Sequence, residues 1–226
     1  ILRPEKLALF MRLMTGPAIK ADAFYILGDL FDDFWIGCDD EYYPNQEVIS
    51  ILREYSANSS TKLFIMRGNR DFHLNQEFAD ATSCTLIEDP TEIILDDQKV
   101  LLLHGDTLCT DDVKYQKWRR FITNPFVKWL YSVMSLKLRT HISRKVRGYS
   151  VEAVQKKAPE IIDVTKKSVL DTLKKFNVNT LIHGHTHRQA RHEIKLNDTQ
   201  AIRFVLGEWF EKDCVLVHDK KPVSCN

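Results

Sequence analysis

Four short motifs in this sequence carry side chains that can bind metal ions. They are Gly28-Asp29, Gly68-Asn69-Arg70-Asp71, His104-Gly105-Asp106 and His183-Gly184-His185-Thr186-His187-Arg188. Carboxylate, amide and imidazole groups without any thiolate favour manganese, iron or zinc in a catalytic site, and manganese is our first choice. Two such ions ~3.5–4 Å apart can activate water for an in-line displacement at phosphorus. Asp29 is our candidate for the ligand that bridges them.

Each motif directly follows a short apolar run, as a loop follows a buried strand. The runs cover residues 23–27, 62–66, 100–103 and 178–182. The carboxyl ends of the strands in an α/β sheet line one crevice, and the glycine of each motif permits a tight turn there. We therefore expect side chains that are distant in sequence to meet at one point. The candidate catalytic and metal-binding residues are Asp29, Asn69, His104, His183 and His185.

Helical patterns between most of these runs predict an α/β fold with helices on both sides of a mixed sheet. The first helix is expected to begin near Pro4 and to end at Gly16-Pro17. Alternating segments near 189–194, 202–206 and 214–218 are expected to form edge strands or strands of a second sheet. The predicted core comprises residues 1–112 and 173–226, and residues 113–172 form a helical insertion over the site.

The insertion has an unusual composition. Between Val113 and Val151 the sequence holds ten Lys and Arg residues and not one Asp or Glu, and many aromatic and aliphatic residues lie between the basic ones. Such a segment can bind nucleic acid, a membrane surface or an anionic lipid, and charge alone does not distinguish these. A solvated basic face over an ordinary helical core is also compatible. The apolar content beside the crevice favours a lid that shelters acyl chains.

The overall composition limits the choices further. The 226 residues suit one α/β core with an insertion, and the net charge of +1 gives the molecule no general attraction to nucleic acid. Five cysteines without a CxxC spacing favour a reducing compartment over a disulfide framework. No apolar run reaches the ~18 residues of a membrane span. We expect a cytoplasmic protein that needs neither a nucleic acid nor an obligate protein partner.

The order GD, GNRD, HGD and GHTHR resembles the calcineurin-like metallophosphoesterase superfamily. The longer strings 25–31, 68–72, 104–112 and 181–188 are more specific and resemble the UDP-2,3-diacylglucosamine hydrolases of lipid A synthesis. This resemblance extends over nearly the whole chain, to Val205-Leu206-Gly207-Glu208-Trp209. It implies a four-layer αββα sandwich with a helical lid, and a peripheral position on the cytoplasmic face of the inner membrane.

The resemblance also implies roles for individual residues. One Mn²⁺ ion would be bound by Asp29, Asn69, His104 and His183, and a second by Asp29 and His185. The positions that match substrate contacts of the family are Asn69, Arg70, Asp112, Ser150, Lys157 and His183. The substrate implied is a nucleotide–lipid pyrophosphate, cleaved to UMP and 2,3-diacylglucosamine 1-phosphate (lipid X) by metal-activated water that attacks the nucleoside-side phosphorus.

Two features depart from the family pattern. The family begins with a strand that ends in Asp-x-His, and these two residues complete one metal site. This sequence starts at the helix that follows, and we expect a strand with the motif to precede it, since a sheet without that strand would expose an edge. The second departure is Val154, at a position where the family commonly has a substrate-binding Asn.

Arg70 bears on the type of phosphate bond. Many relatives in the superfamily carry His at this position, where it can act as a general acid. A poor leaving group such as an alkoxide needs that acid, whereas a phosphate monoester with its second pKa near ~6 leaves as a stable anion. Arg70 offers a planar fork of donors suited to phosphate oxygens instead. The sequence thus favours pyrophosphate hydrolysis, although Arg70 as an ordinary surface residue remains open.

Two other functions remain open. The first is a nucleotide pyrophosphatase or phosphodiesterase of the same superfamily with another substrate. The second is a non-catalytic member that binds a nucleotide or a protein, because the sequence as given lacks the N-terminal Asp-x-His motif of the family. A panel of substrates with and without acyl chains separates the first alternative from a lipid-specific enzyme, and metal analysis separates the second.

Overall fold

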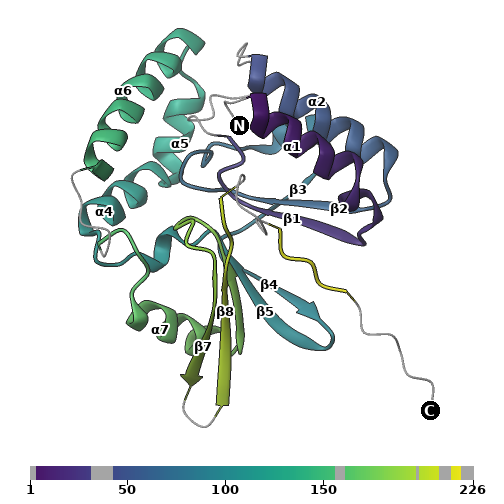
Figure 1. Ribbon diagram of the computed structural model, residues 1–226. Coiled ribbons are helices and arrows are strands. Elements are labelled where there is room, and N and C mark those ends of the chain that lie inside the picture. Colours follow the sequence, from purple (N-terminus) through teal and green to yellow (C-terminus); the bar gives the residue numbers. More distant parts are fainter. Residues whose placement is uncertain (1–3, 32–42, 156–160, 197–198, 209–214, 220–226) are drawn as a thin grey trace.

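Two β-sheets lie face to face in the computed structural model, with helices on their outer faces (Figure 1). The structure describes residues 4–31, 43–155, 161–196, 199–208 and 215–219. The layers alternate as helix, sheet, sheet and helix, and three further helices stand to one side of both sheets (Figure 1). This confirms the predicted αββα sandwich.

The first sheet is parallel and has three described strands in the order β1-β2-β3. The second has five, in the order β4-β5-β6-β8-β7, with β5, β6 and β8 parallel to one another. The strand bounds are β1 (Ala23–Leu27), β2 (Lys62–Met66), β3 (Thr85–Ile87), β4 (Thr91–Leu95), β5 (Gln98–Leu103), β6 (Thr180–His183), β7 (Ala190–Leu196) and β8 (Thr199–Val205). The four apolar runs of the sequence are thus β1, β2, β5 and β6.

Successive side chains of the central strands pack alternately against the other sheet and against the outer helices. On β5, Val100 and Leu102 face the other sheet, whereas Leu101 and Leu103 face the helix α7 (Lys166–Phe176). Successive side chains of a strand point to opposite faces, so a continuous apolar run packs on both. The outer face of the first sheet is covered by α1 (Pro4–Thr15), α2 (Tyr43–Asn58) and α3 (Gln76–Thr82), with the short 3-10 helix η1 (Pro17–Lys20) after α1.

The predicted insertion forms three helices. They are α4 (Val113–Ile122), α5 (Pro125–Ser132) and α6 (Leu136–Gln155), and a short 3-10 helix η2 (Asp106–Leu108) precedes them. The side chains of Asp112 and Asn124 accept hydrogen bonds from backbone N–H groups at the starts of α4 and α5, as N-caps do. We call α4, α5 and α6 the lid helices.

Three details differ from the predictions. The helix α7 begins inside the range 113–172, but Val169 and Leu173 pack on the second sheet, so α7 belongs to the core and the insertion ends before it. Residues 215–219 form no strand, because they pair with no neighbouring strand in the described part of the chain. The strands β3 and β4 were not expected. The predicted first helix is confirmed as α1.

None of the described helices is both long and apolar enough to span a membrane.

Candidate metal centre

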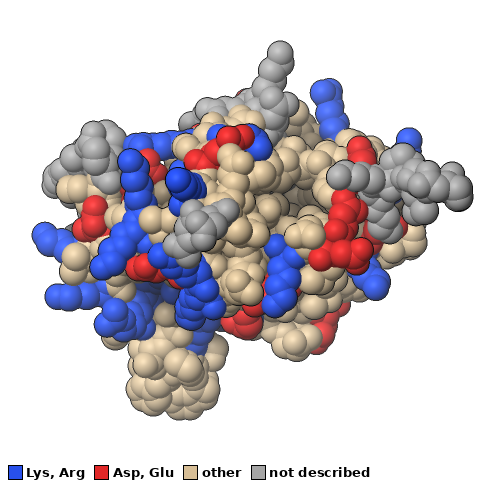
Figure 2. All heavy atoms as spheres, turned by 90° about the horizontal axis from the view of Figure 1, so that it is seen from below, with Lys and Arg blue, Asp and Glu red and all other residues tan. Residues whose placement is uncertain are grey.

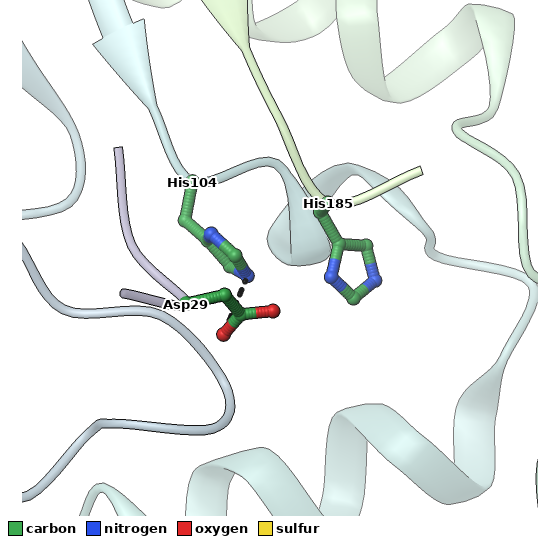
Figure 3. A group of neighbouring side chains, drawn as sticks. All are labelled: Asp29, His104 and His185. Carbon is green, nitrogen blue, oxygen red and sulfur yellow. Dashed lines mark ion pairs between the residues drawn. The ribbon is translucent and has the colours of Figure 1, made fainter. Parts of the chain in front are cut away.

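The loops that follow β1, β2, β5 and β6 meet at one place between the sheets and the lid helices. Asp29, His104 and His185 point toward one another there (Figure 3), and their potential ligand atoms all lie within 4.8 Å of one another. The Oδ1 atom of Asn69 joins them, at 3.0 Å from His104 Nε2 and 2.9 Å from His185 Nδ1. Four of the five predicted ligands are therefore brought together.

Two glycines make this convergence possible. Gly28 has a φ of +86°, and a Cβ atom built on it would lie 2.6 Å from Gly68 Cα. A Cβ atom on Gly68 would lie 2.3 Å from the backbone nitrogen of Asp29. The two loops touch backbone to backbone, and any side chain at either glycine would push Asp29 away from Asn69.

Asp71 fastens the same two loops and was assigned no role from the sequence. Its carboxylate accepts hydrogen bonds from the backbone N–H groups of Leu30 at 2.7 Å, Gly68 at 2.6 Å and Asp29 at 3.3 Å. Complete burial, followed by the nearby charge of Asp29, raises the pKa of Asp71 to about 6. The sequence could have indicated this role, because an acidic residue stands two positions after the predicted ligand Asn69.

His104 presents its Nε2 atom to a cluster of acceptors. Its Nδ1 atom lies 2.8 Å from the carbonyl oxygen of Leu27, which requires a proton on Nδ1. In the neutral ring, the Nε2 lone pair then faces Asn69 Oδ1 at 3.0 Å and Asp29 Oδ1 at 3.7 Å. Burial disfavours a charged ring, but Asp29 and Asp106 outweigh it and raise the pKa of His104. The site therefore attracts positive charge to the point where these acceptors meet.

His185 completes this donor set as a neutral imidazole. It has a φ of +65°, an uncommon value for a residue other than glycine, which turns the loop after β6 toward His104. Burial, and then the charge of His104, lowers the pKa of His185 to about 4. A neutral imidazole is the form that binds metal ions. Carboxylate, amide and imidazole acceptors converging on one point fit a divalent cation.

The structure does not bring His183 into this group. It is the last residue of β6, its Nδ1 atom lies 2.9 Å from its neighbour's carbonyl oxygen at Gly184, and burial lowers its pKa to about 4. Its buried Nε2 atom has no hydrogen-bond partner among the described residues. His104 is close by, since its carbonyl oxygen accepts the N–H of Gly184 at 2.9 Å. The role of His183 as a ligand stays a prediction.

The predicted substrate contacts are only partly described. The backbone N–H of Arg70 donates to Asp29 Oδ1 at 2.9 Å, and its Nε atom lies 3.6 Å from Asp29 Oδ2 with the side chain 44% exposed. Asp112 is buried and caps α4 through the N–H of Tyr115 at 3.1 Å. The side chain of Ser150, like that of Val154, and the whole of Lys157 lie outside the described part. Substrate binding by these residues stays a prediction.

Comparison with known proteins places this site in a family. Residues 4–189 match the calcineurin-like phosphoesterase family. A UDP-2,3-diacylglucosamine hydrolase of Pseudomonas putida (strain F1) is 42% identical over 97% of this chain and 90% of its own length. One of Azotobacter vinelandii is 43% identical over 96% and 89%, and one of Pseudomonas syringae pv. tomato is 42% identical over 98% and 89%.

These matches cover the strands that carry the candidate metal-binding loops, and also the lid helices, which lie between those strands in the sequence. A solved structure described as a novel archaeal phosphodiesterase aligns with 90% of this chain and 76% of that chain, at 14% identity and a TM-score of 0.43. The chain belongs to the calcineurin-like phosphoesterase family, and within it to the family of the UDP-2,3-diacylglucosamine hydrolases.

Proposed function

We propose that this chain hydrolyses the pyrophosphate bond of UDP-2,3-diacylglucosamine to UMP and 2,3-diacylglucosamine 1-phosphate (lipid X), as a step of lipid A biosynthesis. The observation that carries the proposal is the meeting of Asp29, Asn69, His104 and His185 at one point, in a chain 42% identical to a hydrolase named for this substrate. In this proposal, metal-activated water attacks the phosphorus on the nucleoside side.

Two Mn²⁺ ions are the cofactors we propose, with Asp29 as the residue that both ions share. Mixed oxygen and imidazole ligands suit manganese. When bound, a pair of divalent ions activates water and neutralises the charge that develops at phosphorus. The neutral rings of His104 and His185 would hold the ions in place. The buried Nε2 atom of His183, which has no hydrogen-bond partner among the described residues, supports His183 as a further ligand.

Arg70 is proposed to orient the phosphates. Its backbone N–H fixes Asp29, and its partly exposed guanidinium extends from the same loop beside that carboxylate. A guanidinium presents paired N–H donors that match phosphate oxygens. Because the departing lipid phosphate is a stable anion, the reaction needs no general acid at this position. Asp112, Ser150 and Lys157 are also proposed to contact the substrate.

A substrate panel tests this function. The purified chain with Mn²⁺ is expected to cleave UDP-2,3-diacylglucosamine much faster than UDP-N-acetylglucosamine or bis(p-nitrophenyl) phosphate. In ¹⁸O-labelled water, mass spectrometry is expected to find the label in UMP. Equal rates on all three compounds would argue for a general phosphodiesterase, and a label in the lipid phosphate would overturn attack at the nucleoside-side phosphorus.

The lid helices supply the surface that we propose for lipid and membrane contact. On α4, Trp118 and Phe121 are exposed and their rings lie 5.8 Å apart, and on α5 the exposed rings of Phe126 and Trp129 lie 5.8 Å apart. Exposed basic residues accompany them: Lys114, Lys117, Arg120, Lys137, Arg144 and Lys145. Figure 2 shows Lys and Arg gathered on the left, the side on which Figure 1 places α4, α6 and α7.

Aromatic side chains beside basic ones suit the interface of an anionic membrane. We therefore propose that the protein is peripheral on the cytoplasmic face of the inner membrane, where the lipid substrate resides, and that the lid helices shelter its acyl chains. Each CH₂ group that they bury would contribute about 0.8 kcal/mol.

A further inference from the structure

We propose that α4, the first lid helix, is a positioning element of the metal centre, in which Arg119 and Tyr115 hold His104 and His185 in place from outside the site. The inference rests on the metal site of the proposed function. It assigns to this helix a role that does not depend on the lipid substrate.

Arg119 joins two buried carboxylates that border the site. Its Nε atom donates to Asp106 Oδ2 at 2.7 Å, and its Nη2 atom donates to Asp89 Oδ2 at 3.1 Å. The two carboxylate side chains are only 2% and 8% exposed. One guanidinium thus contacts two acidic groups and reduces the repulsion between them in a poorly solvated place.

Asp89 connects Arg119 to the backbone of His104. Its Oδ1 atom accepts the backbone N–H of His104 at 3.2 Å, while its other oxygen is held by Arg119. The backbone of His104 is therefore fixed through one carboxylate to a side chain of α4. The ring is fixed separately, by the carbonyl oxygen of Leu27.

Tyr115 makes the connection to the second histidine. Its hydroxyl donates to Asp106 Oδ2 at 2.5 Å, and its ring stacks on that of His185 with centroids 6.1 Å apart and an angle of 29° between the planes. Tyr115 and Arg119 are four residues apart, so they lie on the same face of α4. That face is turned to the metal centre, while the side chains of Trp118 and Phe121 on the same helix are exposed.

It follows that the lid cannot be removed as a unit without damage to the site. A deletion of residues 113–172 would remove Tyr115 and Arg119 and leave Asp89 and Asp106 as buried, unpaired charges, which is strongly destabilising. Such a deletion is expected to impair every substrate, with or without acyl chains. A truncation that tests lipid binding has to leave α4 in place.

The decisive experiment measures metal binding. Arg119→Met and its matched control Arg120→Met each remove one positive charge from α4, but Arg120 is exposed. We expect calorimetric titration of the metal-free proteins with MnCl₂ to show affinity for Mn²⁺ lowered roughly 10–100-fold in Arg119→Met, as for other residues that orient ligands. The affinity of Arg120→Met should equal that of the unaltered chain. Excess Mn²⁺ should restore part of the lost turnover in Arg119→Met.

Conservative variants separate positioning from folding. Arg119→Lys can reach one carboxylate but lacks the fork that joins two, and Tyr115→Phe keeps the ring but loses the hydroxyl, so both should bind Mn²⁺ more weakly while retaining the circular dichroism spectrum. Unchanged Mn²⁺ affinity in the folded variants, with only a raised KM for substrate, would overturn the proposal. Failure of the chain to hydrolyse the proposed lipid would leave this metal-binding comparison intact, so the two failures are distinguishable.

Discussion

At the scale of single residues, the site is a meeting of hydrogen-bond acceptors. Asn69 Oδ1 lies between two imidazoles, and the carboxylate of Asp29 lies beside one of them. Carboxylate and amide oxygens and imidazole nitrogens are the kinds of ligand that a divalent ion such as Mn²⁺ takes, so these side chains are suited to hold one at this point.

Asn69→Ala is expected to lower turnover by at least about a thousand-fold, because metal catalysis supplies several kcal/mol and about 1.36 kcal/mol is tenfold in rate. The fold should persist, since Asn69 belongs to no core cluster. Steady-state kinetics with Mn²⁺ and thermal melting check both expectations. Asn58→Ala, an exposed position on α2, is the control. Full activity in Asn69→Ala would remove the metal assignment.

At the scale of elements, the lid is attached to the core at more than one place. Apart from α4, the loop after β2 reaches α5, where the ring of His73 stacks on that of Tyr131 at 4.3 Å between centroids. Burial, and then the charges of Lys128 and Arg139, lowers the pKa of His73 from 6.5 to about 4. The packed ring is therefore neutral at pH 7.

This contact predicts a dependence of stability on pH. The folded pKa of His73 is depressed, so its contribution to stability is fully present above about pH 6.5 and is lost as the pH falls toward about 4, when the unfolded chain binds the proton first. Urea unfolding at several pH values is expected to show a shallower loss of stability between pH 6.5 and 4 in His73→Phe. His141→Phe, exposed on α6, is the control. Identical pH profiles for all three proteins would contradict the prediction.

At the scale of the whole molecule, three apolar clusters stabilise the layers independently of any ion. One lies under α1 and α2, one between the sheets and one under α7. None of them contains a predicted ligand. The metal centre sits at the end of the sandwich where strand ends and lid helices meet, so the layers are expected to stay folded without an ion.

Removal of metal is therefore expected to abolish turnover but not the fold. Treatment with EDTA should leave the circular dichroism spectrum intact, and added Mn²⁺ should restore activity. Mn²⁺ at a hundred times its Kd should stabilise the folded chain by about 2.7 kcal/mol. A chain of this size should then melt about 5–10 °C higher. Loss of secondary structure on chelation would show instead that the ion is structural.

Membrane contact belongs to the same scale, because it depends on a surface formed by several helices. Phe126 and Trp129 are 66% and 58% exposed on α5. Changing both to Ser is expected to weaken binding to vesicles with anionic lipid at least about tenfold, since burying one such side chain contributes about 1.5–3 kcal/mol. Ile94→Ser on β4, 61% exposed, is the matched control in vesicle sedimentation. Equal losses in both proteins would argue against a specific lid surface.

The sequence by itself determined the buried strands and the motifs that follow them. Runs such as 100–103 are apolar on both faces, which is typical of a strand covered on both sides, and the polar residue after each run then lies at the end of a strand. The strands β3 and β4 were not predicted, because β3 has only three residues and β4 is exposed at alternate positions, so neither forms a continuous buried run.

Only the tertiary structure decided which polar side chains support the site. Nothing local marks Arg119 among the basic residues of the insertion, or Asp89 in the loop before β4. Their roles arise because two carboxylates from separate loops are buried on either side of one guanidinium. Such long-range contacts follow from how the layers pack, which neither spacing nor composition encodes.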